Sequence, residues 1–355
     1  MNLKQLRAKI NNIDVKILNL LNQRTRAAVA IGKLKWQKGR KVYSPKREAE
    51  VYGRLIRLNK GPLSPRSLKA IYGEIMSSAL SLQKKLTIAY LGPQATFTHE
   101  AARSRFGASV DYLSVDNISG IFNTVEKGYA DYGVVPVENS TEGAVTHSLD
   151  MFVDSGLLVC AEIIVEISNN LLSREGNISR IKRIYSKSEV FGQCRTWLNA
   201  NLPQVEQIEV SSTASAAMRA AGTRGSGAIA SRLAADLYGL RVLSRDIEDA
   251  SHNATRFLVI GKEGAGQTGR DKTSVMFAVK DKVGALHDTL KVFKRNNINL
   301  TKIESRPSRK KAWEYYFFID FNAHREEKKV KKALAELGEH CIFVKVLGSY
   351  PCAVK

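Results

Sequence analysis

The first stretch of the chain, residues 3–36, repeats apolar side chains at alternating steps of four and three. This spacing places them in one stripe along a helix, the heptad pattern of helices that pack on one another. The stripe consists of Leu6, Ile10, Ile13, Ile17, Leu20, Ala27, Ile31 and Leu34. One helix of this length cannot bury such a stripe alone, so the pattern predicts a dimer of chains.

Two further helices are expected before residue 86. Pro45 can occupy the first turn of one helix, and Gly-Pro and Ser-Pro turns separate it from the next. We expect these helices over residues 45–59 and 66–85. Residues 1–86 are therefore predicted to be all-helical.

The hydrophobic period changes at residue 87. Up to residue 262, strand-like and helix-like stretches alternate, which is an α/β pattern. A polar, Gly-rich linker over residues 261–272 precedes a shorter unit in the order βαββαβ, the ferredoxin-like signature. Its strands are expected over 273–280, 299–306, 313–321 and 341–348, and its helices over 284–296 and 326–338. We predict three domains, over residues 1–86, 87–262 and 273–353.

The formal net charge of +21 is unevenly spread along the chain. Residues 1–86 carry a net charge of +16, residues 87–265 of −4 and residues 266–355 of +9. A basic surface can bind nucleic acid, steer small anions or have no specific role. No nucleic-acid-binding motif accompanies the basic segments, so we expect no nucleic-acid partner, and the meaning of the excess charge stays open.

The sequence also bears on compartment and cofactors. Its four cysteines form no CxxC pair and no metal-ligand spacing, so we expect reduced thiols, no metal and no cofactor. No apolar run approaches the roughly 20 residues that span a bilayer. The first residues include no apolar stretch of a secretory signal. We therefore expect a cytoplasmic protein without a membrane partner.

Arg24 interrupts the apolar stripe, where two interpretations fit it: a solvated arginine in a loose seam, or a cation for an anionic ligand. Lys35 favours the second interpretation. It follows eleven residues later, within about 20° on the same helix face and roughly 16 Å away, so both side chains can bracket a small dianion. Arg7 lies roughly 25 Å from Arg24 and could reach that ligand only from an antiparallel partner chain.

Polar side chains cluster where several of the expected middle strands end. They occur in GPQATFTHEAA, VPVENSTEG, IYSKSEVFGQC, SSTASA and NATRF. Each alone fits an ordinary helix cap or hydrogen-bonded turn. Together they predict a cleft that is rich in neutral hydrogen-bonding groups and poor in titratable acids and bases.

Residues 1–86 resemble the all-helical chorismate mutase family in LRAKINNIDVKILNLLNQR, GKLK, REAEV and ALSLQ. The resemblance implies a chorismate site of Arg7 from the other subunit with Arg24, Lys35, Ser44, Arg47, Glu48, Ala79 and Gln83. As catalytic residues, Lys35 and Gln83 would donate to the ether oxygen. Glu48 would orient the ring hydroxyl or, if protonated, donate to the ether. Ser44 and Ala79 depart from the family pattern, which has an aspartate and a small polar residue there.

Residues 87–262 resemble the prephenate dehydratase family in GPQATFTHEAA, VPVENSTEGAV, SSTASAA, AIASRLAADLYGL and NATRF. The resemblance implies two α/β lobes, like those of a periplasmic binding protein, with the site between them. It places at that site Thr96, Glu138, Asn139, Ser140, Ser186, Gln193, Thr255 and Arg256. Thr255, the expected catalytic residue, would donate to the departing hydroxide, and Arg256 would hold a carboxylate. Ala95 and Lys187 stand where glycine and histidine are common.

Residues 273–353 resemble the ACT regulatory domain. KDKVGALHDTL and IESRP match the two stretches with which dehydratase tails bind phenylalanine. The resemblance implies a phenylalanine site of Gly284, Ala285, Leu286, Glu304, Ser305 and Arg306. The backbone N–H groups at the start of the expected helix suit a carboxylate. A plain packing unit of the same topology is the alternative.

The three resemblances imply one enzyme of L-phenylalanine biosynthesis. It would be an isomerase that rearranges chorismate to prephenate and a lyase that converts prephenate to phenylpyruvate, with feedback inhibition by phenylalanine. An amino-acid-sensing regulator with one activity lost is the alternative, and the retention of Arg24, Lys35 and Thr255 argues against it. A fusion to a dehydrogenase is disfavoured because no GxGxxG follows a strand.

Overall fold

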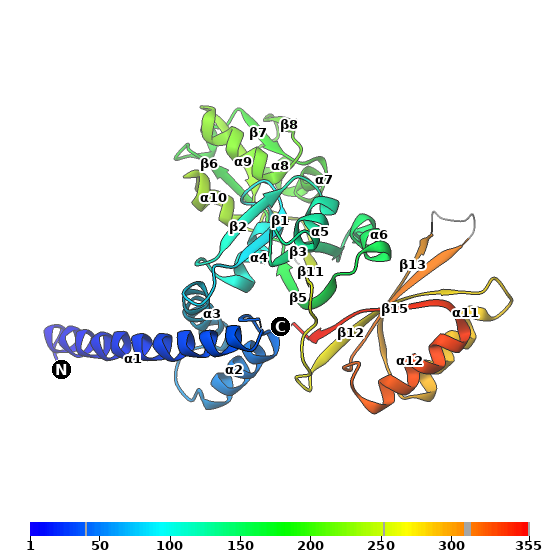
Figure 1. The fold of residues 1–355 in the computed structure, drawn as a ribbon. Helices are drawn as coiled ribbons and strands as arrows, with labels where there is room; N and C mark the ends of the chain where they lie inside the picture. The colour runs from blue at the N-terminus through cyan, green and yellow to red at the C-terminus, as the bar shows by residue number, and fades with distance from the viewer. Residues whose placement is uncertain (40, 251–252, 309–313, 354–355) are drawn as a thin grey trace. The chain divides into compact units, whose positions relative to one another are not determined.

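The chain forms two units, which we describe separately (Figure 1). One contains Met1–Thr87 and Arg103–Asp111, and the other contains Ile88–Ala102 and the chain from Tyr112 onward. The computed structural model describes residues 1–39, 41–250, 253–308 and 314–353.

The first unit consists mainly of three helices. They are α1 (Leu3–Gln37), α2 (Pro45–Leu58) and α3 (Pro65–Ser81). Asn2 and Gln5 form a capping box at the start of α1. Ser44 and Ser64 accept backbone N–H groups at the starts of α2 and α3, each just before a proline that needs no hydrogen-bond partner. The expectation of an all-helical first part is confirmed.

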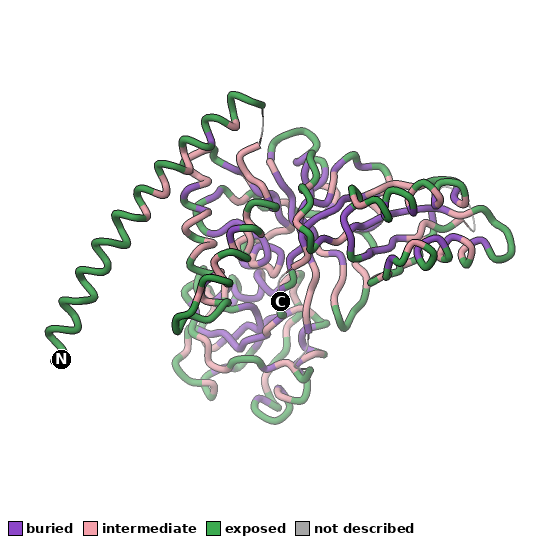
Figure 2. Tube along the Cα trace, turned by 90° about the horizontal axis from the view of Figure 1, so that it is seen from below, coloured by how far each residue is buried: buried purple, intermediate pink, exposed green. Residues whose placement is uncertain are grey.

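The apolar stripe of α1 lies on the surface of the single chain. Each of its eight residues is exposed, and Gly32 is the one buried residue of the helix. Figure 2 shows most of α1 coloured as exposed. An isolated helix with this stripe in water leaves a large apolar area uncovered, which is the situation that a partner helix relieves.

The second unit begins with two lobes, each built on its own sheet. The first sheet has the order β2-β1-β3-β11-β5, and β4 pairs with β3. The second has the order β10-β6-β9-β7-β8. The chain crosses from the first lobe to the second after β5 and returns at β11, so two segments join the lobes. The strands are β1 (Thr87–Leu91), β2 (Asp111–Val115), β3 (Tyr132–Asn139), β4 (Gly143–Ala144), β5 (Leu158–Glu166), β6 (Asn170–Ser173), β7 (Arg183–Ser186), β8 (Glu206–Glu209), β9 (Ser226–Ala230), β10 (Arg241–Ser244) and β11 (Ala254–Gly261).

Short helices flank these two sheets. Many begin at a polar cap, as at Asn117, Ser212 and Ser231, whose side chains accept a backbone N–H. The helices are α4 (Phe97–Phe106), α5 (Ile118–Glu126), α6 (Thr146–Asp154), η1 (Ile178–Arg180), α7 (Ser188–Gln193), α8 (Arg195–Asn201), α9 (Thr213–Gly222) and α10 (Arg232–Tyr238).

The last part of the second unit is a four-stranded sheet with two helices on one face (Figure 1). Its strand order is β13-β14-β12-β15. The elements follow in the chain as β12 (Asp271–Val279), α11 (Ala285–Arg295), β13 (Leu300–Pro307), β14 (Tyr315–Phe321), α12 (Lys328–His340) and β15 (Cys341–Pro351). This is the predicted βαββαβ order. Trp313, expected to open a strand, lies outside the described residues.

The two faces of this sheet bury different cores. Phe277 and Val275 pack with α11 and α12. Met276, Phe318 and Tyr350, on the other face, join a core that also holds Phe152 and other residues of the first lobe. The predicted succession of a helical part, a two-lobed α/β part and a βαββαβ part is confirmed. Within the described residues, no helix is long and apolar enough to span a bilayer.

Candidate functional site

The expected chorismate cations lie along α1. Arg7 is exposed and Arg24 is half-buried, and neither has an ion pair with a described residue. Lys35 is half-buried, and its Nζ donates to the Val42 carbonyl at 2.8 Å. Burial, and then the nearby charge of Arg47, lower the pKa of Lys35. An ammonium group has three donors, so this bond leaves Lys35 two more for a ligand.

Gln83 lies directly against α1. A Cβ atom added to Gly32 would come within 2.6 Å of Gln83 Oε1, so this close approach requires a glycine. The Gln83 amide donates to the carbonyl of buried Ala79 at 2.9 Å. Residues three apart on a helix are neighbours, so the contact at Gly32 places Gln83 beside Lys35. Ala79 thus acts on the site through its backbone.

Glu48 sits in a buried hydrogen-bonded triangle that the sequence did not reveal. Arg105 Nη2 lies 3.0 Å from Glu48 Oε2, and the Tyr43 hydroxyl donates to the same oxygen at 3.1 Å. Arg105 Nε donates to Tyr43 at 3.0 Å. Both donors meet one carboxylate oxygen, which leaves Oε1 for a ligand. Burial raises the pKa of Glu48, and Arg105 and Tyr43 oppose that rise.

Two other expected residues of this site have local roles. The Ser44 hydroxyl accepts the Arg47 backbone N–H at 3.3 Å and so caps α2. The Arg47 guanidinium forms an exposed ion pair with Glu50 at 3.0 Å. An exposed pair of this kind contributes little free energy, so a ligand could displace it readily.

The expected prephenate site contains a cluster of amides and hydroxyls around Thr255. Cross-strand pairing sets Thr255 of β11 opposite Asn139 of β3. Asn139 Nδ2 donates to Thr255 Oγ1 at 2.9 Å and to Asn253 Oδ1 at 2.7 Å. The side-chain Oδ1 of Asn139 accepts from the backbone N–H groups of Thr141 and Glu142, which fixes the orientation of the amide.

This cluster continues into the second lobe. Gln193, at the end of α7, accepts from Asn253 at 3.4 Å and from Asn169 at 3.3 Å. Its own amide donates to Glu142 at 3.0 Å. The sequence indicates Asn139, Gln193 and Thr255 as site residues but not Asn253, although Asn253 opens the NATRF stretch that contains Thr255. Amides and hydroxyls therefore predominate in this cluster, with the Glu142 carboxylate beside Gln193.

Three other expected prephenate residues are held by the backbone. The Ser140 hydroxyl accepts from Ala254 N at 2.9 Å. The Ser186 hydroxyl, fully buried, donates to the Ile229 carbonyl at 2.9 Å. Thr96 donates to the Leu91 carbonyl at 2.7 Å and accepts from His99 N at 3.3 Å, so it opens α4. These contacts shape the loops around the cleft.

Ala95 stands where glycine is common in the family, and its backbone conformation shows why glycine is favoured there. Its φ of +70° lies in the left-handed region, which favours glycine. A non-glycine residue there costs about 1–2 kcal/mol. The methyl group is fully buried, so alanine is accommodated here at the expense of some backbone strain.

Arg256 and Glu138 point away from this cluster. Successive strand residues face opposite sides of a sheet, and Arg256 is paired across strands with Glu138 as Thr255 is with Asn139. The Arg256 guanidinium lies 3.0 Å from Glu162 and 2.5 Å from Asp320. It is thus occupied by protein carboxylates, which differs from the expected role of holding a substrate carboxylate.

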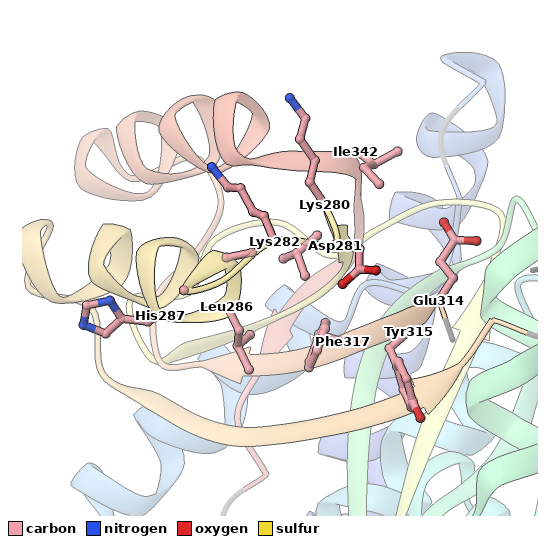
Figure 3. Close-up of a pocket in the computed structure, with 12 residues that line it drawn as sticks. Lys280, Asp281, Lys282, Leu286, His287, Glu314, Tyr315, Phe317 and Ile342 are labelled. Carbon is pink, nitrogen blue, oxygen red and sulfur yellow. The ribbon is translucent and has the colours of Figure 1, made fainter. Parts of the chain in front are cut away.

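A pocket of about 400 Å³ opens at the start of α11. Gly284, Ala285 and Leu286, expected to bind phenylalanine, line it. Figure 3 shows apolar Leu286, Phe317 and Ile342 there, together with Lys280 and Lys282. Gly284 is the N-cap of α11 and has a φ of +77°, and no side chain caps the helix. The Ala285 N–H donates to the Lys282 carbonyl at 3.2 Å, and the next two N–H groups, those of Leu286 and His287, are available to an anion.

The second expected phenylalanine-binding stretch lies on β13. Ser305 pairs across strands with Phe317, so it lies on the side of the sheet that carries the pocket. Glu304 and Arg306 face the other side, where Arg306 lies 3.5 Å from Asp150 of α6. Within one chain, the expected residues are therefore divided between the two faces of this sheet.

Neither a metal site nor a disulfide stands out in the described part of the chain. It holds no group of three or more His, Cys, Asp or Glu side chains that could bind a metal ion. The four cysteines are free. The chemistry of the sites described above rests on ion pairs, amides and hydroxyls.

Comparison with known proteins identifies the family. Models of three families match the chain in order: chorismate mutase type II over residues 6–84, prephenate dehydratase over 88–265 and ACT domain over 273–339. A bifunctional chorismate mutase/prephenate dehydratase of Aquifex aeolicus is 49% identical, over 99% of this chain and 98% of that protein. This chain belongs to the bifunctional chorismate mutase/prephenate dehydratase family. A member from Stutzerimonas stutzeri is 45% identical over the same shares of both chains.

Solved structures agree with this assignment for the second unit. A prephenate dehydratase from Arthrobacter aurescens in complex with L-Phe is 36% identical, with a TM-score of 0.69 over 75% of this chain and 90% of that chain. The prephenate dehydratase of Staphylococcus aureus is 29% identical, with a TM-score of 0.66 over 75% of this chain and all of that one. The family predicted from the sequence is thus confirmed, while the roles of single residues stay predictions.

The first prediction concerns Arg105. Arg105→Gln should lower mutase kcat/KM about tenfold or more, because a charge-assisted bond that orients Glu48 contributes about 1.5–3 kcal/mol. Loss of the cation should also raise the pKa of Glu48, so the fall in activity on the acid side should begin at higher pH. Steady-state assays across pH measure both effects. Arg103→Gln, on the same helix, is the control. Unchanged kcat/KM in Arg105→Gln would show that Glu48 needs no such partner.

The second prediction concerns Lys35. Its lowered pKa means that it loses its charge at a lower pH than an ordinary lysine. Mutase kcat/KM should therefore fall on the alkaline side below the usual lysine range near 10.5. In Lys35→Arg the side chain stays charged, and this alkaline fall should disappear. A pH profile identical to that of the unaltered protein would rule out Lys35 as the titrating group.

Proposed function

We propose that one chain performs two successive reactions at the sites described above. The helical unit rearranges chorismate to prephenate, and the two-lobed part converts prephenate to phenylpyruvate. The observation that carries this proposal is the placement of Thr255 within the neutral Asn139 and Asn253 cluster, in a chain that matches both enzyme families. The last domain senses L-phenylalanine, the end product of the route.

The first reaction needs positioning and charge more than acid–base chemistry. Chorismate rearranges in one pericyclic step with no covalent intermediate, so catalysis comes from holding the compact conformer and stabilising charge on the ether oxygen. Arg7, Arg24 and Arg47 supply cations for the carboxylates. Lys35 and Gln83, side by side, donate to the ether oxygen. Glu48 presents its free Oε1 to the ring hydroxyl.

The second reaction needs help for a departing hydroxide. Prephenate loses carbon dioxide and its ring hydroxyl together, and aromatisation drives both losses. Thr255 accepts a hydrogen bond from Asn139, so its own hydroxyl proton remains available to the leaving group. Hydrogen-bond donation suits a threonine better than full proton transfer, because its hydroxyl is a weak acid.

The pocket at the start of α11 suits a zwitterionic, aromatic ligand. Its helix N-terminus fits the carboxylate of phenylalanine, and Leu286, Phe317 and Ile342 fit the ring. The A. aurescens dehydratase, which matches 75% of this chain, was solved in complex with L-Phe. We include L-phenylalanine as effector, a homodimer or larger homo-oligomer and a cytoplasmic location in the proposal.

The third prediction is that the two activities separate. Thr255→Val keeps the shape of the side chain but removes the hydroxyl, so phenylpyruvate formation from prephenate should fall about 100-fold or more. Thr255→Ser should retain a large part of it. Both variants should consume chorismate normally, because the mutase site lies in the other unit. Equal loss of both activities in Thr255→Val would contradict two separate sites.

The fourth prediction is that the mutase site is shared between two chains. Arg7 and Arg24 lie roughly 25 Å apart on one rigid helix, so both cannot grip one chorismate molecule from the same chain. An antiparallel pairing through the exposed stripe would bring Arg7 of one chain to Arg24 of the other. Arg7→Ala and Arg24→Ala chains, each nearly inactive, should recover activity when they are refolded together.

The expected recovery is quantitative. Random mixing makes about half of the dimers mixed, each with one intact site, so activity per chain should approach about a quarter of the unaltered value. Refolding each variant alone is the control. No recovery despite demonstrated subunit exchange would mean that each chain builds its own site.

A further inference from the structure

We call the sheet β13-β14-β12-β15, which carries the pocket at the start of α11, the sensor sheet. A network of largely buried charges links it to β3, β5 and β11 of the first lobe. The network contains three cations and three carboxylates, so its formal charge is zero. Its members are Arg256, Lys272, Lys302, Glu138, Glu162 and Asp320. Glu162 is 2% exposed and Asp320 is 9% exposed, so these charges have given up most of their hydration. Glu138, which is 40% exposed, is the least buried member. The network favours one defined geometry, because loss of the partners of Glu162 or Asp320 would leave a buried charge unpaired.

Arg256 is the centre of this network. Its Nε lies 3.0 Å from Glu162 of β5, and its Nη1 lies 2.5 Å from Asp320 of β14. Its Nη2 donates to the Tyr350 hydroxyl of β15 at 2.9 Å. One side chain on the strand of Thr255 therefore contacts a neighbouring catalytic-lobe strand and two strands of the sensor sheet.

Arg256, Asp320, Ser274 and Tyr350 form a closed ring of hydrogen bonds, in which each donor and acceptor can be assigned. Ser274 donates to Asp320 at 2.5 Å, and the Ser274 and Tyr350 hydroxyls lie 2.6 Å apart. Since Ser274 spends its proton on Asp320, Tyr350 must donate to Ser274 and accept from Arg256. Burial raises the pKa of Tyr350, which keeps its proton in place. These contacts fix the position of the Arg256 guanidinium.

A second link ties the neighbouring strand. Glu138, which precedes Asn139 on β3, lies 2.8 Å from Lys302 of β13. Thus each strand of the Thr255 and Asn139 pair is linked to the sensor sheet by an adjacent residue. On β11 this residue is Arg256, and on β3 it is Glu138. Because side chains alternate along a strand, one face of this strand pair carries the proposed reacting groups, and the opposite face carries the ion pairs.

The sensor sheet uses the same alternation. On β14, Phe317 lines the pocket, while Asp320, three residues later, faces Arg256. The sheet also lies close to the catalytic lobe, since a Cβ on Gly348 of β15 would come within 2.2 Å of the Val159 carbonyl of β5. A shift of this sheet that follows ligand binding would act on Thr255 through Asp320 and Arg256, and on Asn139 through Lys302 and Glu138.

We propose that Arg256 is a positioning residue, which couples the strand of Thr255 to the sensor sheet and thereby carries the phenylalanine response to the dehydratase site. The proposal rests on the dehydratase function given above. It differs from a substrate-binding role for Arg256 in what each variant should change. A ligand for a substrate carboxylate controls KM, whereas a residue that positions Thr255 controls kcat and the response to the effector.

The test compares Arg256→Gln, Asp320→Asn, the double variant and Asp150→Asn in the full-length chain. Asp320→Asn is isosteric and lies in the sensor sheet, far along the chain from any expected substrate residue. Asp150→Asn removes another ion pair between the same two parts, the one between α6 and Arg306 of β13. For each protein, kcat and KM for added prephenate, the half-inhibitory phenylalanine concentration and the phenylalanine-induced rise in Tm are measured. A cooperative thermal transition close to that of the unaltered protein reports whether each variant is folded.

We expect Arg256→Gln and Asp320→Asn to lower kcat about tenfold with KM within about twofold of the unaltered value. The double variant should be no worse than the worse single variant, because both single changes already break the Arg256–Asp320 ion pair. Phenylalanine should still raise Tm in Asp320→Asn, but half-inhibition should require at least about ten times more of it. Asp150→Asn should keep its kcat.

Two results would overturn the proposal. One is an increase in KM of about tenfold or more in Arg256→Gln with Asp320→Asn like the unaltered protein, which would make Arg256 a substrate ligand. The other is normal kcat and normal inhibition in Asp320→Asn, which decides the matter even if Arg256→Gln does not fold. An unaltered chain that is inactive on prephenate would instead contradict the dehydratase function itself.

Discussion

Pairing between β3 and β11 is the constraint on which the second unit depends. The register sets Thr255 opposite Asn139 and Arg256 opposite Glu138. Because strand residues alternate, one face of this pair receives an uncharged cluster suited to a leaving hydroxyl, and the other receives a compensated set of buried charges. A slip of one residue would exchange the two faces and place charges in the cleft. The hydrogen bonds from Asn139 and the ion pairs of Arg256 each favour the same register.

Two features characterise the helical unit: the close contact between Gln83 and Gly32 of α1, and the exposed apolar stripe of α1. Gly32 lets Gln83 lie against α1, which brings an amide beside Lys35 without any polar atom left buried and unpaired at that point. The remainder of α1 presents an apolar stripe that one chain leaves uncovered. The proposed mutase site and the exposed stripe therefore lie on the same helix, and the dimer proposed above would complete the set of cations around chorismate.

Much of this could be predicted from the sequence, because it is local. Heptad spacing foretold α1, proline positions foretold the starts of α2 and α3, and the order of periods foretold the βαββαβ part. Motif resemblance found Thr255 and Asn139. The partners of Glu48 and Arg256 could not be predicted in this way. Arg105 follows Glu48 by 57 residues, in a stretch that resembles a different family, and Asp320 follows Arg256 by 64 residues. Such pairs depend on strand register and helix packing, which a single sequence does not display.

The same limit explains why Arg256 was expected in the cleft. Its neighbour Thr255 lies there, and adjacency in sequence suggests adjacency in the site, whereas alternation along a strand sends adjacent side chains to opposite faces. The central claim is that one chain carries both reactions and a sensor. The most direct test supplies the purified chain with chorismate alone and follows prephenate and phenylpyruvate with time, with and without L-phenylalanine. The account predicts that chorismate disappears, that phenylpyruvate accumulates, and that phenylalanine halts the second step. Accumulation of prephenate without phenylpyruvate, or phenylpyruvate formation that phenylalanine leaves unchanged, would contradict it.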